Sequence, residues 1–449
     1  MKDFTNNAGV LVPDVLLPQP GTDMTKWAVV ACDQYTSQPD YWAETERIVG
    51  DAPSTLRLML PEMYLEQPDE AQRIAAINAT MKQYLESGIL QSKGQGFVYV
   101  RRTAGGNTRS GLIVALDLEQ YDYSKGSTTL IRATEGTIVA RIPPRLRIRK
   151  DAPVELPHIL VLIDDPERTV IEAIGQSVTE EDKLYDFDLM QNGGHVAGWL
   201  VQDEARVSAA LRALEALADP AAFRAKYGAD QPPLLFAMGD GNHSFATAKA
   251  NWEEKKKGLT LEQQRNHPAR YALVELENVH DQGIIFEPIH RVLFHLDVEK
   301  SIQWLTDKLA GDNGGCQVFR FNDKAECEAS MAKCCPECGS HKLPFVTKEG
   351  YGYFKVKQPA AQLEVGTLQN ALDAMLQAMP QATIDYIHGE DVVNDLGGKA
   401  GNMGFLLPPM SKSAFFKTVI FDGALPRKTF SMGEANEKRY YLECRKISE

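Results

Sequence analysis

Residues 234–258 read LLFAMGDGNHSFATAKANWEEKKKG, and this stretch predicts a strand, a glycine turn and a helix in direct succession. Its apolar start, Leu234–Met238, follows two prolines and is typical of a buried strand. Gly239-Asp240-Gly241 indicates a turn. The residues that follow favour a helix, with lysines in its last turn and Gly258 as a stop signal.

The start of this predicted helix has the properties of an anion site. Unpaired backbone N–H groups at a helix N-terminus converge on one spot and favour a phosphate. The turn residues that we expect to bind phosphate are Gly239, Gly241, Asn242 and Ser244. Asp240 and His243 add an acid/base pair beside them. The alternative is an ordinary strand-to-helix connection in which Asp240 only caps the helix, because single glycine-turn motifs often occur without a ligand.

The length, net charge and composition of the chain restrict its possible partners and location. The chain has 449 residues, enough for two or three domains, and a formal net charge of −13. This charge argues against a duplex nucleic acid as partner. Because no apolar run approaches the ~20 residues of a membrane span and no secretory signal is visible, we expect no membrane partner and a cytoplasmic location. The seven cysteines form no regular framework, which favours reduced thiols.

Predicted strands and helices alternate along the chain, and several hairpin signals argue against a purely parallel sheet. We therefore expect an α/β (α+β mixed) fold with mixed sheets, flanking helices and two halves around a central cleft. The stretch ADQPP at 229–233 is the best linker candidate. It divides the chain into an N-terminal α/β region, 1–230, and a C-terminal α/β region, 231–449, that contains the turn.

Two polar segments interrupt the strand pattern near the middle of the N-terminal region. Arg132–Thr137 places an arginine and Glu135 within an apolar stretch, where charges are costly unless they are paired or used. The alternative is a solvated strand end. The basic run RIPPRLRIRK at 141–150 alternates charged and apolar residues, and this alternation is typical of one solvated face of a strand.

A cysteine cluster gives the main metal signal. Cys335 and Cys338 have zinc-knuckle spacing, and Cys327 or His341 could add ligands. Because a second matching pair is missing, reduced thiols are favoured over structural zinc. The sequence contains no Gly-x-Ser-x-Gly elbow where a strand meets a helix, no Walker-type phosphate loop and no Gly-x-Gly-x-x-Gly turn.

Four segments, taken together, resemble a bacterial and archaeal family, domain of unknown function 1015. Gly239–Ala248 resembles its Asp-Gly-His-His-Arg motif, and Arg132–Thr137 is similar to its Arg-His-Glu segment. Pro288–Arg291 resembles its Pro-Thr-His-Arg element, and Pro426–Thr429 its Pro-x-Lys-Ser element. The four segments occur in the family's order and span most of the chain.

The Asp-Gly-x-His turn is also similar to that of the ParB/sulfiredoxin-like superfamily. Members of this superfamily bind nucleotide phosphates at the helix N-terminus, and some phosphorylate free serine. The resemblance implies a nucleotide-dependent phosphotransferase, serine kinase-like, that acts on a small hydroxy amino acid. Two residues depart from the motif, because Asn242 replaces a histidine and Ser244 replaces an arginine. Since a guanidinium is a fork-shaped phosphate ligand, another cation must compensate for its loss.

These resemblances assign a role to each candidate residue. Arg132, Arg291 and Lys428 are the candidate countercharges, with Arg291 favoured, and Glu135 is the candidate base, with His243 as alternative. Asp240 is a candidate Mg²⁺ ligand. The expected partners are a nucleotide and a small-molecule substrate. The sequence does not decide whether the protein is an enzyme, because a nucleotide-binding switch or a phosphatase would need similar anion contacts. Donor and oligomeric state are also open.

Overall fold

The computed structural model describes residue 4 and residues 6–124, 126–333 and 339–448. It contains two compact units, which are described separately below. Unit 1 comprises residues 1–285 and 432–449, and unit 2 comprises residues 286–431. Unit 1 is therefore discontinuous in sequence. The boundary expected near residue 230 lies inside unit 1, between a helix and the strand that leads to the glycine turn.

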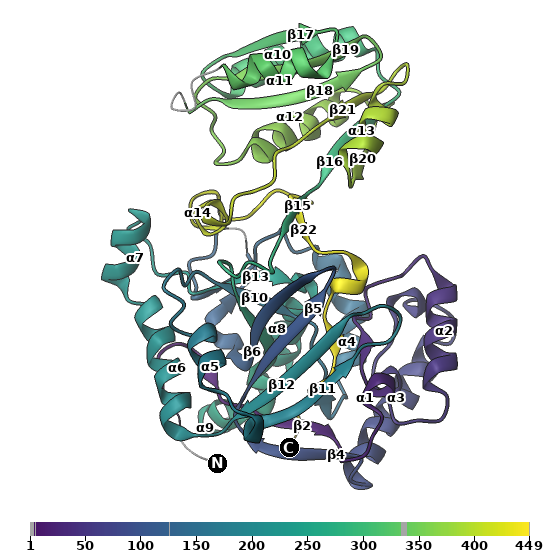
Figure 1. Cartoon of the computed structure of the whole chain (residues 1–449), viewed down its shortest axis with the longest axis vertical. Helices are drawn as coiled ribbons and strands as arrows, with labels where there is room; N and C mark the ends of the chain where they lie inside the picture. Colours follow the sequence, from purple (N-terminus) through teal and green to yellow (C-terminus); the bar gives the residue numbers. More distant parts are fainter. Residues whose placement is uncertain (1–3, 5, 125, 334–338, 449) are drawn as a thin grey trace. The chain divides into compact units, whose positions relative to one another are not determined.

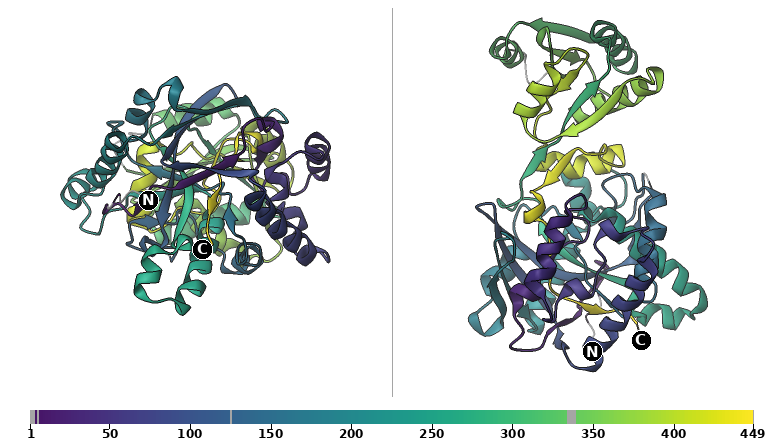
Figure 2. Two further views of the ribbon diagram at one scale, coloured as in Figure 1. Left: turned by 90° about the horizontal axis from the view of Figure 1, so that it is seen from below. Right: turned by 90° about the vertical axis from the view of Figure 1, so that its right-hand side faces the viewer.

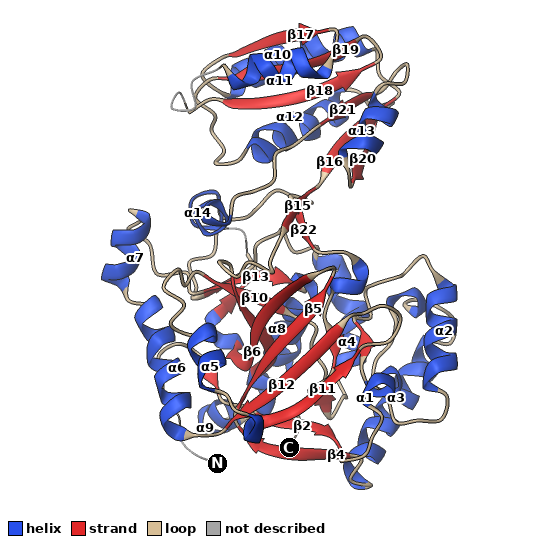
Figure 3. Cartoon of the chain, viewed as in Figure 1, coloured by secondary structure: helices blue, strands red, loops and turns tan. Residues whose placement is uncertain are grey.

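Unit 1 is built on one large mixed sheet flanked by helices, so the α/β prediction is confirmed (Figures 1 and 3). In spatial order its strands are β11 (Lys183–Asp188), β12 (His195–Val201), β5 (Phe97–Ala104), β6 (Asn107–Asp117), β14 (Tyr271–Asn278), β10 (Leu160–Ile163), β13 (Phe236–Asp240), β8 (Ile131–Arg132) and β7 (Tyr121–Asp122). In addition, β1 (Val10–Leu11) pairs with β6. Three pairs, β10–β14, β13–β8 and β7–β8, are parallel, and the others are antiparallel.

Helices cover this sheet, and α2 and α3 lie on the opposite side of unit 1 from α5 and α6 (Figure 1). The helices of unit 1 are α1 (Met24–Trp27), α2 (Pro39–Val49), α3 (Glu70–Glu86), α4 (Ile142–Arg149), α5 (Ile171–Ser177), α6 (Glu204–Leu217), α7 (Pro220–Tyr227), α8 (Asn242–Lys255) and α9 (Leu261–Asn266). Aspartate side chains cap two of these helices: Asp203 and Asp219 each accept a hydrogen bond from a backbone N–H group in the first turn of the helix that follows. As expected, α7 ends at Gly228, which has a left-handed backbone.

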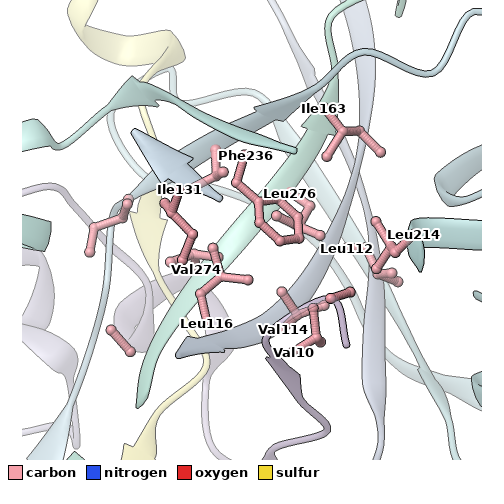
Figure 4. Packing of buried hydrophobic residues seen from close by; sticks show 14 of the residues in the cluster. Val10, Leu112, Val114, Leu116, Ile131, Ile163, Leu214, Phe236, Val274 and Leu276 are labelled. Carbon is pink, nitrogen blue, oxygen red and sulfur yellow. The ribbon is translucent and has the colours of Figure 1, made fainter. Parts of the chain in front are cut away.

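The sheet separates two hydrophobic cores, because alternate residues of a strand face opposite sides. Val274 and Leu276 of β14 belong to the core that also contains Phe245 and Trp252 of α8. Leu273, the residue before Val274, belongs to the other core. Figure 4 shows the first core, where Leu112, Val114 and Leu116 of β6 lie beside β14.

The basic run at 141–150 forms helix α4, so the strand prediction was wrong. Pro143 and Pro144 fall in the first turn of this helix, where the fixed φ of proline fits and its missing N–H costs nothing. The alternation of arginine with apolar residues did not reflect a strand face.

The C-terminal segment returns to unit 1 after unit 2 and pairs there with distant strands (Figure 2). The small sheets of unit 1 pair β2 (Asp14–Pro18) with β4 (Leu90–Gln95), β3 (Val29–Val30) with β23 (Tyr440–Tyr441), and β9 (Val154–Glu155) with β24 (Arg445–Lys446). Tyr440 pairs with Val30, and Arg445 with Glu155. The last residues of the chain are therefore an integral part of unit 1.

Unit 2 is built on an antiparallel six-stranded sheet. In spatial order its strands are β17 (Cys316–Phe321), β19 (Gly350–Val356), β18 (His341–Thr347), β21 (Met403–Phe405), β16 (His290–Phe294) and β20 (Thr383–Ile387). Its helices are α10 (Val298–Asp312), α11 (Lys324–Ala332), α12 (Glu364–Ala378), α13 (Glu390–Gly397) and α14 (Lys412–Asp422). A two-stranded sheet pairs β15 (Phe286–Pro288) with β22 (Phe430–Met432). The side chain of His341 forms a hydrogen bond with Thr367 of α12, whereas the side chain of the next residue, Lys342, donates to the carbonyl group of Met331 in α11. Because successive residues of a strand point to opposite faces, these helices cover opposite faces of the sheet.

Searching the described residues reveals no helix with the length and apolar character needed to cross a bilayer.

A buried ion pair anchors the C-terminal segment, and its loss should be costly. Arg445 Nη2 lies 2.7 Å from Glu155 Oε1, and both side chains are almost fully buried. We expect Arg445→Met to lower the free energy of unfolding by about 3–5 kcal/mol, because the Glu155 charge loses one of its partners in the core. Chemical denaturation measures this loss. The control is Arg47→Met, at an exposed pair with Glu44, which should cost at most about 1 kcal/mol. Equal losses in both variants would contradict the assignment.

Candidate functional site

The turn between β13 and α8 lies where the sequence predicts it, although β13 includes Gly239 and Asp240 and only Gly241 separates the strand from the helix. Gly241 has a φ of +80° and occupies the N-cap position of α8. Because glycine has no side chain, the N-cap residue does not cap the first backbone N–H groups of α8, at Asn242, His243 and Ser244. Such a helix start suits an anion.

Gly241 and Gly239, the last glycine of β13, both pack closely against neighbouring residues. A Cβ on Gly241 would lie 3.1 Å from the Cα of Ile159, and the positive φ disfavours any other residue. A Cβ on Gly239 would lie 3.1 Å from Cγ of Leu162 and 3.2 Å from Sδ of Met432. The neighbouring strand and the returning C-terminal segment thus fix the backbone of the turn.

Asp240 is held by a cation that the sequence analysis did not identify. Its Oδ2 lies 3.1 Å from Nζ of Lys438, and its Oδ1 accepts the Gly241 N–H at 2.8 Å. Burial is the largest single influence and would raise the pKa of the Asp240 carboxyl, but the charges of Lys438 and His158 and the hydrogen bonds from Lys438 and Gly241 together outweigh it and lower the pKa. Asp240 is therefore ionised at neutral pH, and Lys438 places a positive charge next to the start of α8.

The segment that contains Glu135 is bonded to the first turn of α8. Thr134 N donates to Oδ1 of Asn242 at 3.2 Å, and Ile138 N donates to Nε2 of His243 at 3.3 Å. These bonds flank Glu135, which is half-buried. The structure thus brings the backbone segment that contains Glu135 to the first turn of α8, although the two segments are more than a hundred residues apart.

His243 is neutral at physiological pH. Burial and the positive charges of Arg145 and Arg141 lower its pKa to about 4, against an ordinary value of 6.5. An unprotonated Nε2 is also what the bond from Ile138 N requires. His243 therefore suits a hydrogen-bond acceptor better than a proton donor.

Ser244, which stands where the resembling motif has arginine, contacts His158. Its Oγ lies 3.2 Å from Nε2 of His158, and Nδ1 of His158 lies 2.9 Å from the hydroxyl of Tyr441. Oδ2 of Asp33 lies 3.7 Å from the same Nε2. His158 and Tyr441 are buried. Neither residue was identified from the sequence, because they come from distant segments whose proximity only the fold creates.

A cavity of about 140 Å³ adjoins this group. Its wall includes Ser244 and Thr247 of α8 together with His158 and Tyr441. The remaining wall is mostly apolar and is formed by residues of the N-terminal region and of α4. The first turn of α8 thus borders both the candidate anion site and a small cavity.

The three predicted countercharges occupy other environments. Arg132 is buried and donates to the carbonyl groups of Thr129 and Pro232. Arg291, in unit 2, is fully buried and donates to Gln369 Oε1 and to the carbonyl groups of Ile289 and Arg427. These contacts favour a structural role for Arg291, so its phosphate role stays a prediction. Lys428, also in unit 2, is exposed.

The metal predictions have limited support. No group of three or more His, Cys, Asp or Glu side chains within the described ranges is arranged to hold a metal ion. Asp240 provides one carboxylate, which fits a Mg²⁺ held mainly by phosphate oxygens. Cys335 and Cys338 lie outside the described residues. Of the suggested additional ligands, Cys327 is buried in α11, and Nδ1 of His341 lies 2.8 Å from Oγ1 of Thr367.

A family model described as "Protein of unknown function (DUF1015)" matches residues 16–375. The chain belongs to this family. The match includes the turn, the Glu135 segment and the element at 288–291, whereas the element at 426–429 lies outside it. The family assignment is therefore confirmed, and the similarity to the ParB/sulfiredoxin-like superfamily stays a prediction. No curated protein matches the chain.

Solved structures give weaker comparisons. A free serine kinase in complex with AMP is 10% identical, with 75% of this chain and 92% of that chain covered and a TM-score of 0.37. A conserved hypothetical protein from Pyrococcus furiosus is 13% identical, with 75% and 95% covered and a TM-score of 0.34. SbnI with a C-terminal truncation, from Staphylococcus aureus, is 9% identical, with 74% and 87% covered and a TM-score of 0.33. These TM-scores are too low to support an argument.

The His243 environment predicts an unusual titration. We expect the imidazole NMR signals of His243 to titrate with a midpoint near pH 4 instead of 6.5, and Arg145→Gln to raise this midpoint by removing a nearby positive charge. Because the unfolded chain binds the proton more readily, the stability contributed by neutral His243 is present above pH 6.5 and is lost as the pH falls toward 4. Arg224→Gln, at an exposed position on α7, is the control. A midpoint near 6.5 in the unaltered protein would refute the assignment.

The Gly241 backbone predicts a second, independent effect. Gly241→Ala should lower the free energy of unfolding by at least about 1–2 kcal/mol, because alanine is strained at a positive φ. Gly258→Ala is the matched control, since a Cβ added at Gly258 would have open space around it among the described residues. Thermal or urea unfolding of both variants measures the difference, and an unaffected Gly241→Ala variant would contradict the described turn.

Proposed function

We propose that this protein is a nucleotide-dependent phosphotransferase that phosphorylates a small hydroxy amino acid, with serine as the first candidate. The observation that carries this proposal is the convergence at α8 of an uncapped helix start, an ion-paired carboxylate and a segment with a carboxylate base. Phosphoryl transfer depends mainly on positioning and countercharge, which such an arrangement supplies.

Each part would have a defined task. The backbone N–H groups of residues 242–244 would bind phosphate oxygens of the nucleotide. Lys438 would supply the countercharge that the family arginine supplies at the position of Ser244. Mg²⁺, when bound, would neutralise phosphate charge, with Asp240 as its candidate protein ligand.

Glu135 would act on the acceptor. Its carboxylate would take the proton of the acceptor hydroxyl while the hydroxyl oxygen bonds to the terminal phosphorus of the nucleotide. The bond from that phosphorus to its bridging oxygen breaks in the same step, and the shortened nucleotide leaves. Neutral His243 would accept a hydrogen bond and keep the Glu135 segment in place.

Incubation with Mg²⁺, serine and one of ATP, ADP, CTP or pyrophosphate tests the proposal. We expect phosphoserine with at least one donor, detected by mass spectrometry, and a loss of about 10²–10⁴-fold in rate for Glu135→Gln. The control is Glu254→Gln, at an exposed position on α8. If no donor is consumed with any acceptor tested, while a nucleotide still raises the melting temperature, the protein is a binding switch and the proposal fails.

The role of Lys438 can be tested separately. Lys438→Met should lower kcat/KM by about 10²–10³-fold, because it removes a charge beside the transferred phosphoryl group. It should also raise the pKa of Asp240, since the charge of Lys438 contributes most among the groups that lower this pKa. Lys257→Met, at an exposed lysine just after α8, is the matched control. Equal activity of the two variants would exclude Lys438 as the countercharge.

A further inference from the structure

The cavity beside α8 combines an apolar wall with a polar group at the candidate phosphate site. Its apolar wall is made mainly of aliphatic side chains and includes Met81, Ile148, Ala152 and Leu156. Ser244, His158 and Tyr441 are the polar residues that are bonded to one another. A molecule in this cavity would therefore have apolar surroundings and hydrogen-bonding groups next to the first turn of α8.

The size of the cavity limits what it can hold. Its volume of about 140 Å³ is close to that of an engineered cavity of roughly 150 Å³, lined by aliphatic and aromatic side chains, that binds benzene. Free serine has a single CH₂ group as its apolar part and would leave most of this wall without contacts. The wall instead fits an apolar group of about six carbon atoms.

The cavity also presents an ion pair. Arg145 and Glu62 both line it and contact each other, and their side chains retain 17% and 19% exposure. An α-amino acid carries an ammonium and a carboxylate on one carbon atom. Glu62 and Arg145 match these two charges, because a carboxylate and a guanidinium recognise them with charge-assisted hydrogen bonds. The second charged pair in the wall, Arg149 with Glu155, is bound within the protein, since Glu155 also contacts Arg445.

From these observations we propose that the cavity binds the acceptor, and that the acceptor is a hydroxy amino acid with a benzene-sized apolar side group. This inference rests on the proposed function and names its substrate class. The charged head would lie at Glu62 and Arg145, the apolar group in the cavity, and the hydroxyl beside the first turn of α8, to which the segment of the proposed base Glu135 is bonded. A nucleobase is disfavoured, because its polar edges would face hydrocarbon side chains and lose hydrogen bonds.

Calorimetric titration without nucleotide tests this inference on the full chain. The probes are L-serine and L-phenylserine, which is serine with a phenyl group on its β-carbon. We expect phenylserine to bind about 10- to 100-fold more tightly, because the phenyl group buries apolar surface in the cavity. Equal or weaker binding of phenylserine would overturn the inference.

Two variants that fill the cavity test whether the phenyl group of phenylserine binds there. Ala152→Leu fills the cavity and should abolish the preference for phenylserine, and Leu156→Phe, at a partly exposed position, should do the same if the first variant does not fold. Ala225→Leu, on the exposed face of α7, is the control. ADP affinity is measured in parallel. If filling the cavity weakens ADP binding and leaves amino acid binding intact, the cavity holds the nucleobase and the inference is wrong.

The outcomes for the two proposals are distinguishable. If phenylserine binds in a manner that depends on Ala152 but no phosphorylated product forms with any donor, the cavity assignment holds and the phosphotransferase proposal fails. If serine is phosphorylated and phenylserine neither binds nor reacts, the phosphotransferase proposal holds and the cavity assignment fails.

Discussion

The pairing of buried charges in the C-terminal segment is the constraint on which unit 1 depends. Arg439 Nη1 lies 2.7 Å from Glu275 Oε2, and Arg445 Nη2 lies 2.7 Å from Glu155 Oε1. All four side chains are at most 5% exposed. Because an unpaired charge in a protein core is very unfavourable, this segment has to dock in one register against the sheet. The ion pairs therefore define position as much as they contribute stability.

This register places the functional groups. Lys438 immediately precedes the first of the two buried arginines and Tyr441 lies between them in sequence, and they contact Asp240 and His158 respectively. The ion pairs thus hold one side of the site, and the hydrogen bonds from Thr134 and Ile138 to α8 hold the other. Glycine at position 241 is the local requirement that allows both sides to meet the start of the helix.

The features that the sequence predicted correctly are local ones. The strand, turn and helix around residues 236–255 follow from neighbouring residues. The contact of Lys438 with Asp240 joins residues 198 positions apart, and no periodicity or composition could indicate it. For Arg291, a local motif was visible in the sequence but did not indicate the surroundings of the side chain. Its motif indicated a phosphate ligand, but burial and bonds to carbonyl groups inside unit 2 determine its surroundings. For α4, the two prolines indicated the start of a helix more reliably than the alternating arginines indicated a strand, because proline fixes the backbone angle φ directly.

The insertion of unit 2 between residues 285 and 432 has a consequence for biosynthesis. The ribosome must synthesise all of unit 2 before it produces the strand that completes unit 1. Until then the carboxylates of Glu155 and Glu275 have no C-terminal arginine, and Asp240 has no lysine. A chain that terminates before residue 438 would therefore contain the whole family match and still lack a finished site.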